Sequence, residues 1–152
     1  YRAKDVGFVF QFYNLIPTLT AIENIQIVAE ITDAPIDAKK VIDDVGLSDH
    51  KYQFPSQLSG GEQQRISIAR AVCKNPKMLL CDEPTGALDS ETGVQILSLL
   101  QSLSREQDKT VVIVTHNAAL AQAADKVIRV KNGKIKEVTI NESPKAVSEV
   151  TW

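Results

Sequence analysis

The stretch that decides the fold is Met78-Leu79-Leu80-Cys81-Asp82-Glu83, which Pro84 follows. Its apolar residues run without interruption to a turn, and this pattern predicts a strand buried on both faces, as in a parallel sheet. Asp82 and Glu83 then stand at the carboxyl end of that strand, the edge where open α/β sheets bind ligands. Two acids there predict either a metal ligand beside a group that handles a proton, or a strand that simply emerges into solvent. Taken alone, the stretch favours the solvent interpretation.

Two further apolar runs, Val6 to Phe10 and Val111 to Val114, also predict buried strands. Gln11 follows the first run and His116 follows the second, so both are expected at the same sheet edge as Asp82. Each has a simpler interpretation, because Gln11 suits any polar loop and a lone histidine is more often a hydrogen-bonded loop residue than a catalyst. Three strands that deliver polar groups to one crevice nevertheless carry more weight than any one of them.

Helical patterns lie between these strands. They predict helices over about 21–30 with a Thr20–Glu23 capping box, from Asp37 to Gly46, from Ser59 to Asn75-Pro76, and from an Asp89 or Ser90 cap to about Ser104. Residues 20–57 are expected to form a small helical lobe. The alternation of strands and helices predicts an α/β fold with a mostly parallel sheet.

The last part of the chain has a different pattern. Asn117 is expected to cap a short alanine-rich helix to about Ala124, and the Asn132-Gly133 pair predicts a hairpin turn between strands 126–130 and 135–138. No element is predicted for the tail, residues 141–152, apart from a short helix.

Ser59-Gly60-Gly61-Glu62 has two interpretations. Ser59 and Glu62 have capping-box spacing, so the stretch is explained as a helix start. Each glycine, however, costs about 1 kcal/mol in a helix relative to alanine, so the pair indicates that something approaches the backbone closely. A phosphate at the positive helix end fits that role as well as a plain cap does.

Composition narrows the class of protein. The 152 residues suffice for one domain, and 17 basic against 19 acidic residues, with no run of five like charges, argue against nucleic acid as a partner. Cys73 and Cys81 are expected to be packed thiols in a reducing compartment. No apolar run approaches the ~18 residues that cross a bilayer. We therefore expect a cytoplasmic protein.

Together these motifs resemble those of ATP-binding-cassette (ABC) ATPases. Leu58-Ser59-Gly60-Gly61-Glu62-Gln63 looks like the signature motif, and Leu79 to Pro84 resembles the Walker B strand. Val9-Phe10-Gln11 resembles the Q-loop entry, Ala87-Leu88-Asp89 the D-loop and Val114-Thr115-His116 the switch histidine. Five motifs in the family's order cover about residues 6–135.

The resemblance implies a fold and its division. The chain is expected to be the carboxyl-terminal part of a P-loop NTPase (RecA-like) core with an inserted α-helical lobe. Core strand and Q-loop fall in 1–19, and the lobe with the signature helix falls in 20–75. The core with Walker B, D-loop and switch histidine falls in 76–140, and the tail in 141–152.

The resemblance also implies residue roles toward ATP and Mg²⁺. Asp82 would hold Mg²⁺ through water, Glu83 would polarise the attacking water, Gln11 would contact both, and His116 would contact the γ-phosphate. Positioning and charge neutralisation of this kind are what phosphoryl transfer needs. The remaining nucleotide-binding positions act across a head-to-tail dimer with a second ATPase subunit: Ser59, Gly60, Gly61, Glu62, Gln63 and Asp89.

One family motif has no counterpart in these residues. No stretch fits G-x-x-x-x-G-K-[ST], the loop that cradles the β and γ phosphates. The sequence is therefore expected to be about two thirds of an ATPase domain. By itself it is expected to bind nucleotide weakly, not to hydrolyse ATP, and to pair strands with other chains through open sheet edges.

The function expected from the resemblance is an ATPase subunit that powers a transmembrane permease from the inner face of the membrane. The Phe8 to Phe12 entry, Leu15-Ile16-Pro17, Glu23-Asn24-Ile25 and Gly86 to Asp89 resemble the lipoprotein-release and macrolide or peptide-antibiotic exporter group. Two alternatives are a soluble ABC-type ATPase that acts on ribosomes or DNA, and a regulatory module without catalysis.

Overall fold

The computed structural model describes residues 5–151. They form two compact units, one that runs to Val114 and one from Thr115 onward. Each unit is described by itself.

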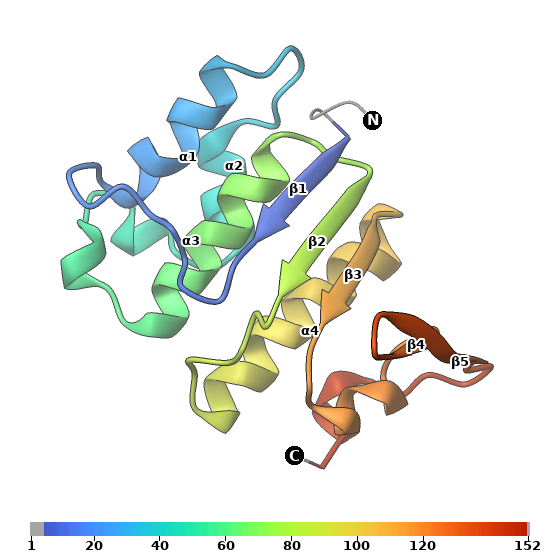
Figure 1. The fold of residues 1–152 in the computed structure, drawn as a ribbon. Helices are drawn as coiled ribbons and strands as arrows, with labels where there is room; N and C mark the ends of the chain where they lie inside the picture. Colours follow the sequence, from blue (N-terminus) through green and yellow to red (C-terminus); the bar gives the residue numbers. More distant parts are fainter. Residues whose placement is uncertain (1–4, 152) are drawn as a thin grey trace. The chain divides into compact units, whose positions relative to one another are not determined.

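A three-stranded parallel sheet forms the centre of the first unit (Figure 1). Its strands are β1 (Val6–Val9), β2 (Met78–Asp82) and β3 (Thr110–Val114), in the order β1-β2-β3. The register pairs Val9 with Cys81 and Asp82 with Val114. All three strands therefore end at the same edge, as the sequence predicted, and the mostly parallel α/β fold is confirmed.

Four α-helices complete this unit: α1 (Ala21–Glu30), α2 (Ala38–Asp44), α3 (Gly60–Cys73) and α4 (Ser90–Gln107). Figure 1 shows α3 beside β1 and α4 behind β3, while α1 and α2 pack on α3. Short 3₁₀ turns, η1 (Ser48–His50) and η2 (Pro55–Gln57), connect α2 to α3. Helices are thus present between the first two strands, as the sequence predicted, and their division into a separate lobe stays a prediction.

The helix starts follow the predicted capping chemistry. The Thr20 hydroxyl accepts from the Glu23 amide while the Glu23 carboxylate accepts from the Thr20 amide. Asp37 and Asp89 cap α2 and α4 with their carboxylates, and Gly46 follows α2 with a φ of 75°. Glycine suits this left-handed position because it has no β-carbon.

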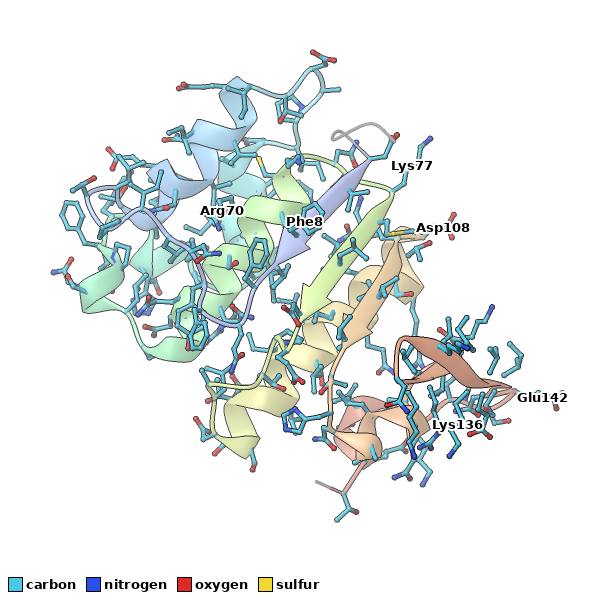
Figure 2. All side chains as sticks on the ribbon, in the orientation of Figure 1. Phe8, Arg70, Lys77, Asp108, Lys136 and Glu142 are labelled. Carbon is cyan, nitrogen blue, oxygen red and sulfur yellow. The ribbon has the colours of Figure 1, made fainter. Side chains whose placement is uncertain are left out.

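The two faces of the sheet differ in burial. Val9, Leu79 and Cys81 are at most 1% exposed on the face that the helices cover. On the opposite face Phe8 is 52% exposed and stacks on Phe10 with ring centroids 6.1 Å apart (Figure 2). The prediction of strands buried on both faces is therefore wrong for the described residues, because the uninterrupted apolar runs are covered by helices on one face alone.

The second unit is built around an antiparallel hairpin. Strands β4 (Lys126–Lys131) and β5 (Lys134–Ile140) pair across Asn132 and Gly133, which both have positive φ, as this kind of hairpin turn requires. The alanine-rich segment is a 3₁₀ helix, η3 (Ala118–Gln122), capped by Asn117. Five residues are too few for a stable α-helix, which explains this difference from the sequence analysis. A last turn, η4 (Val147–Glu149), lies in the tail.

Throughout residues 5–151, no helix combines the length and the apolar character that crossing a membrane requires.

Burial of the two cysteines leads to a testable prediction. Burial raises the pKa of the Cys81 thiol to about 12, and burial together with the nearby Asp37 charge raises the pKa of Cys73. Both thiols should therefore stay neutral and unreactive toward a disulfide reagent at pH 8 until the protein is unfolded in urea.

The same shifts give stability a pH dependence. Unfolded thiols ionise near pH 9 whereas the folded Cys81 thiol does not, so the free energy of unfolding should fall as the pH rises from about 9 toward 12. Replacing Cys81 with alanine should flatten this dependence. Fast labelling of the native protein at pH 8 would contradict the prediction.

Candidate functional site

The carboxyl edge of the sheet gathers Gln11, Asp82 and Glu83. Gln11 follows β1 by two residues, and Asp82 ends β2. A β-carbon on Gly86 would lie 2.6 Å from Gln11 Nε2, so the Gln11 amide lies against the turn that follows Glu83. The structure therefore brings Gln11 next to the acidic segment, as the sequence predicted.

Glu83 has a backbone conformation that few non-glycine residues adopt. Its φ is 43°, and such a left-handed residue costs about 1–3 kcal/mol. Two main-chain hydrogen bonds hold it there: its amide donates to the Val114 carbonyl over 2.9 Å, and its carbonyl accepts from the Gly86 amide over 3.0 Å. Asp82 is exposed and Glu83 is half-buried. A strand that simply ran into solvent would not need this turn, so the geometry favours the interpretation as a site.

His116 belongs to the second unit, where it is exposed. Its predicted contact with a phosphate stays a prediction.

The start of α3 is a complete capping box. The Ser59 hydroxyl accepts from the Glu62 amide over 3.2 Å, and the Glu62 carboxylate accepts from the Ser59 amide over 2.8 Å. Glu62 also lies 3.8 Å from His50 Nε2, and the Gln63 side chain donates to the Leu58 carbonyl. The simpler interpretation of this motif is thus confirmed as a description of its local structure.

The two glycines of the motif are each approached closely by a side chain of the same protein. A β-carbon on Gly60 would lie 2.8 Å from the Tyr13 hydroxyl and 3.3 Å from the Leu88 side chain. A β-carbon on Gly61 would overlap the methyl group of Thr92. The close approach that the double glycine indicated is therefore real, and within the described residues it comes from Tyr13 and Thr92.

Arg70 connects α3 to the segment that follows β1 (Figure 2). Its guanidinium donates to the carbonyls of Asn14, over 2.6 Å, and Tyr13, over 3.1 Å. Both of these residues are left-handed, with φ of 50° and 63°. Burial lowers the pKa of Arg70, but a guanidinium stays charged at neutral pH. Arg70 thus stabilises a backbone conformation that is otherwise unfavourable.

Two buried amides complete the connections. Gln64 of α3 donates to the Pro84 carbonyl over 2.7 Å, directly after Glu83. Asn24 of α1 accepts from the Ile16 amide over 2.8 Å and donates to the Leu19 carbonyl over 3.1 Å. The segment from Gln11 to Thr20 is therefore fixed by both α1 and α3. Sequence reasoning missed these contacts, because a single Asn, Gln or Arg within a helix carries no signal of its partner.

Asp89 caps α4 through Thr92. The Thr92 amide donates to Asp89 Oδ1 over 2.9 Å, and the Thr92 hydroxyl donates to Oδ2 over 2.8 Å. Both bonds lower the pKa of Asp89, and the bond from the Thr92 amide has the larger effect. The sequence identified Asp89 but not Thr92, although its position three residues after the cap was a usable signal.

Comparison with known proteins agrees with the motifs. The profile of the ABC transporter family matches residues 1–86. The chain belongs to the ABC transporter family. An uncharacterized ABC transporter ATP-binding protein of Mycobacterium tuberculosis is 44% identical over 140 residues, which are 89% of this chain and 56% of that protein. The lipoprotein-releasing system ATP-binding protein LolD 2 of Rhodopirellula baltica is 43% identical over 93% of this chain and 60% of its own length.

Two further ABC proteins are similar to the chain, one in sequence and one in structure. The macrolide export ATP-binding/permease protein MacB of Rhodopirellula baltica is 44% identical over 90% of this chain and 21% of its own length. The ATP-binding cassette MJ0796, solved as a dimer in a post-hydrolysis state bound to ADP and Pi, superposes with a TM-score of 0.76 at 39% identity, over 90% of this chain and 63% of that chain. The chain thus has an ABC cassette fold, and it spans 56% of the Mycobacterium tuberculosis protein and 60% of LolD 2.

Replacing Arg70 with lysine tests how the segment after β1 is held. Lysine cannot donate to two carbonyls from a rigid fork, so Tyr13 and Asn14 should lose their support. We expect the free energy of unfolding to fall by about 1–3 kcal/mol. Chymotrypsin should also cleave faster at Phe12 and Tyr13.

Arg129→Lys is the matched control, since Arg129 makes an exposed ion pair with Glu137. Equal cleavage rates in the Arg70 and Arg129 variants would show that the guanidinium does not hold this segment.

Proposed function

We propose that the intact protein is the ATP-binding and ATP-hydrolysing subunit of an ABC transporter. The observation that carries this proposal is that the Gln11 amide lies against the Gly86 turn, at the sheet edge where Asp82 ends β2 and Glu83 is held in a strained turn. Family membership supplies the reaction class, ATP to ADP and phosphate.

The side chains at this edge suit Mg²⁺ and a water nucleophile. Asp82 and Gln11 offer oxygen ligands, which Mg²⁺ prefers, and Asp82 is exposed. When bound, the metal neutralises charge on the transferred phosphate. Glu83, half-buried beside Asp82, would polarise the attacking water, and His116 would contact the γ-phosphate.

The other nucleotide contacts are proposed to act on ATP bound to a second subunit. They are contributed by the start of α3 and by the cap of α4: Ser59, Gly60, Gly61, Glu62, Gln63 and Asp89. The dimeric structures of the similar cassette MJ0796 support pairing of two ATPase subunits, and the head-to-tail arrangement is part of the proposal.

The permease partner is proposed from the relatives and from the surface of the helical lobe. Ile31 is 83% exposed and Tyr52 is 72% exposed, and Phe12 beside Gln11 is 74% exposed. Apolar groups in such positions suit a protein partner. The names of the LolD 2 and MacB relatives support the lipoprotein-release and macrolide-export group. The subunit would then work at the cytoplasmic face of the membrane.

Glu83→Gln tests the catalytic assignment in the intact protein. The amide keeps the size of the side chain but cannot polarise water as a carboxylate does, so ATP turnover should fall by at least about 10²-fold. ATP should still bind and hold a dimer, which light scattering would detect.

Glu106→Gln, an exposed change near the end of α4, is the matched control and should retain wild-type turnover. Undiminished ATPase activity in Glu83→Gln would refute the role proposed for Glu83.

A polypeptide of these 152 residues should not turn over ATP by itself. It contains no G-x-x-x-x-G-K-[ST] stretch, so the backbone cradle and the lysine for the β and γ phosphates are lacking. Titration calorimetry should show weak ATP binding. Tight stoichiometric binding would contradict this expectation.

A further inference from the structure

Thr92 contacts two of the segments to which the proposed function assigns nucleotide binding. Its hydroxyl and its amide both donate to the Asp89 carboxylate. Its methyl group occupies the space that a β-carbon on Gly61 would need. One half-buried side chain on α4 thus lies between the D-loop carboxylate and the second glycine of the signature motif.

The two contacts cannot change independently. Threonine is branched at Cβ, so its hydroxyl and methyl groups turn together about a single torsion with three staggered positions. The bond from Thr92 Oγ1 to Asp89 Oδ2 selects one of these positions, and that position directs the methyl group at Gly61. A rotation that cleared space at Gly61 would break the bond to Asp89.

A plain helix cap does not need this arrangement. The backbone amide of Thr92 already donates to Asp89 Oδ1, which is the bond that caps α4. The hydroxyl bond is additional. A second contact connects the same two segments, because the Leu88 side chain lies 3.3 Å from the β-carbon position of Gly60.

We propose that Thr92 is a positioning residue that couples the D-loop to the signature turn within one subunit. It holds the Asp89 carboxylate and sets the position of the Gly61 backbone, so both would face the nucleotide of the second subunit in one fixed relation. The inference rests on the proposed function, because it gives Thr92 a role through Asp89 and Gly61 rather than through its own contact with ATP.

Two conservative substitutions remove the methyl group and the hydroxyl group of Thr92 separately. Thr92→Ser keeps both hydrogen bonds to Asp89 and removes the methyl group, whereas Thr92→Val keeps the methyl and the backbone cap and removes the hydroxyl bond. In the intact protein Thr92→Val should raise the ATP concentration needed for dimerisation about tenfold in the Glu83→Gln background. Its melting temperature should match that of Thr110→Val, an exposed control on β3.

Rescue gives the decisive comparison. Gly61→Ala should have a lower melting temperature than the wild type, because its β-carbon overlaps the Thr92 methyl. Adding Thr92→Ser removes that methyl, so the double variant should recover the melting temperature of Thr92→Ser alone, whatever the added β-carbon does to nucleotide contact. If Gly61→Ala does not fold by itself, recovery of folding in the double variant reports the same contact.

The outcomes are distinct. Wild-type dimerisation in Thr92→Val, or a loss of melting temperature in Gly61→Ala that Thr92→Ser leaves unchanged, would overturn the coupling while the ATPase assignment stands. Intact wild-type protein that neither turns over ATP nor dimerises with it would overturn the proposed function and this inference together.

Discussion

Parallel pairing of β2 between β1 and β3 is the constraint on which the rest of the structure depends. Val9 pairs with Cys81, which pairs with Ile113, so the three strands end at the same edge of the sheet. Gln11 reaches Gly86 because of this register, and the Glu83 amide reaches the Val114 carbonyl for the same reason. A shift of one strand by one residue would move each of its side chains to the opposite face of the sheet, and it would separate the polar groups at the edge.

Helix α3 carries the contacts that keep the loops around this edge in place. Gln64 donates a hydrogen bond to the Pro84 carbonyl, and Arg70 donates to the Tyr13 and Asn14 carbonyls. The side chains of Tyr13 and Thr92 pack closely against the glycines at the start of α3. Glycine at positions 60 and 61 is thus required by packing within the subunit, beside any close approach of nucleotide. A change at either glycine should therefore disturb the neighbouring loops as well as the ligand site.

Unfavourable backbone conformations occur at Glu83 and in the segment that follows Gln11. Glu83, Tyr13 and Asn14 are all left-handed. Main-chain bonds with Val114 and Gly86 hold Glu83, whereas Arg70 of α3 holds both Tyr13 and Asn14. Such residues persist only where the surrounding structure over-determines them. The order of the site therefore depends on packing of α3 against the sheet, so loss of that packing should impair function before the secondary structure is lost.

The sequence by itself determined the parallel α/β order and the helix caps at Thr20 and Ser59, and it narrowed the cap of α4 to Asp89 or Ser90, because apolar periodicity and capping spacing are local signals. It also indicated that Gly60 and Gly61 are approached closely, but not by what. Tertiary structure alone decided that Tyr13 and Thr92 approach them, that Arg70 supports the segment after β1, and that helices cover one sheet face. These contacts join residues up to 57 positions apart, and the chain pattern around a single residue holds no information about a partner at that distance.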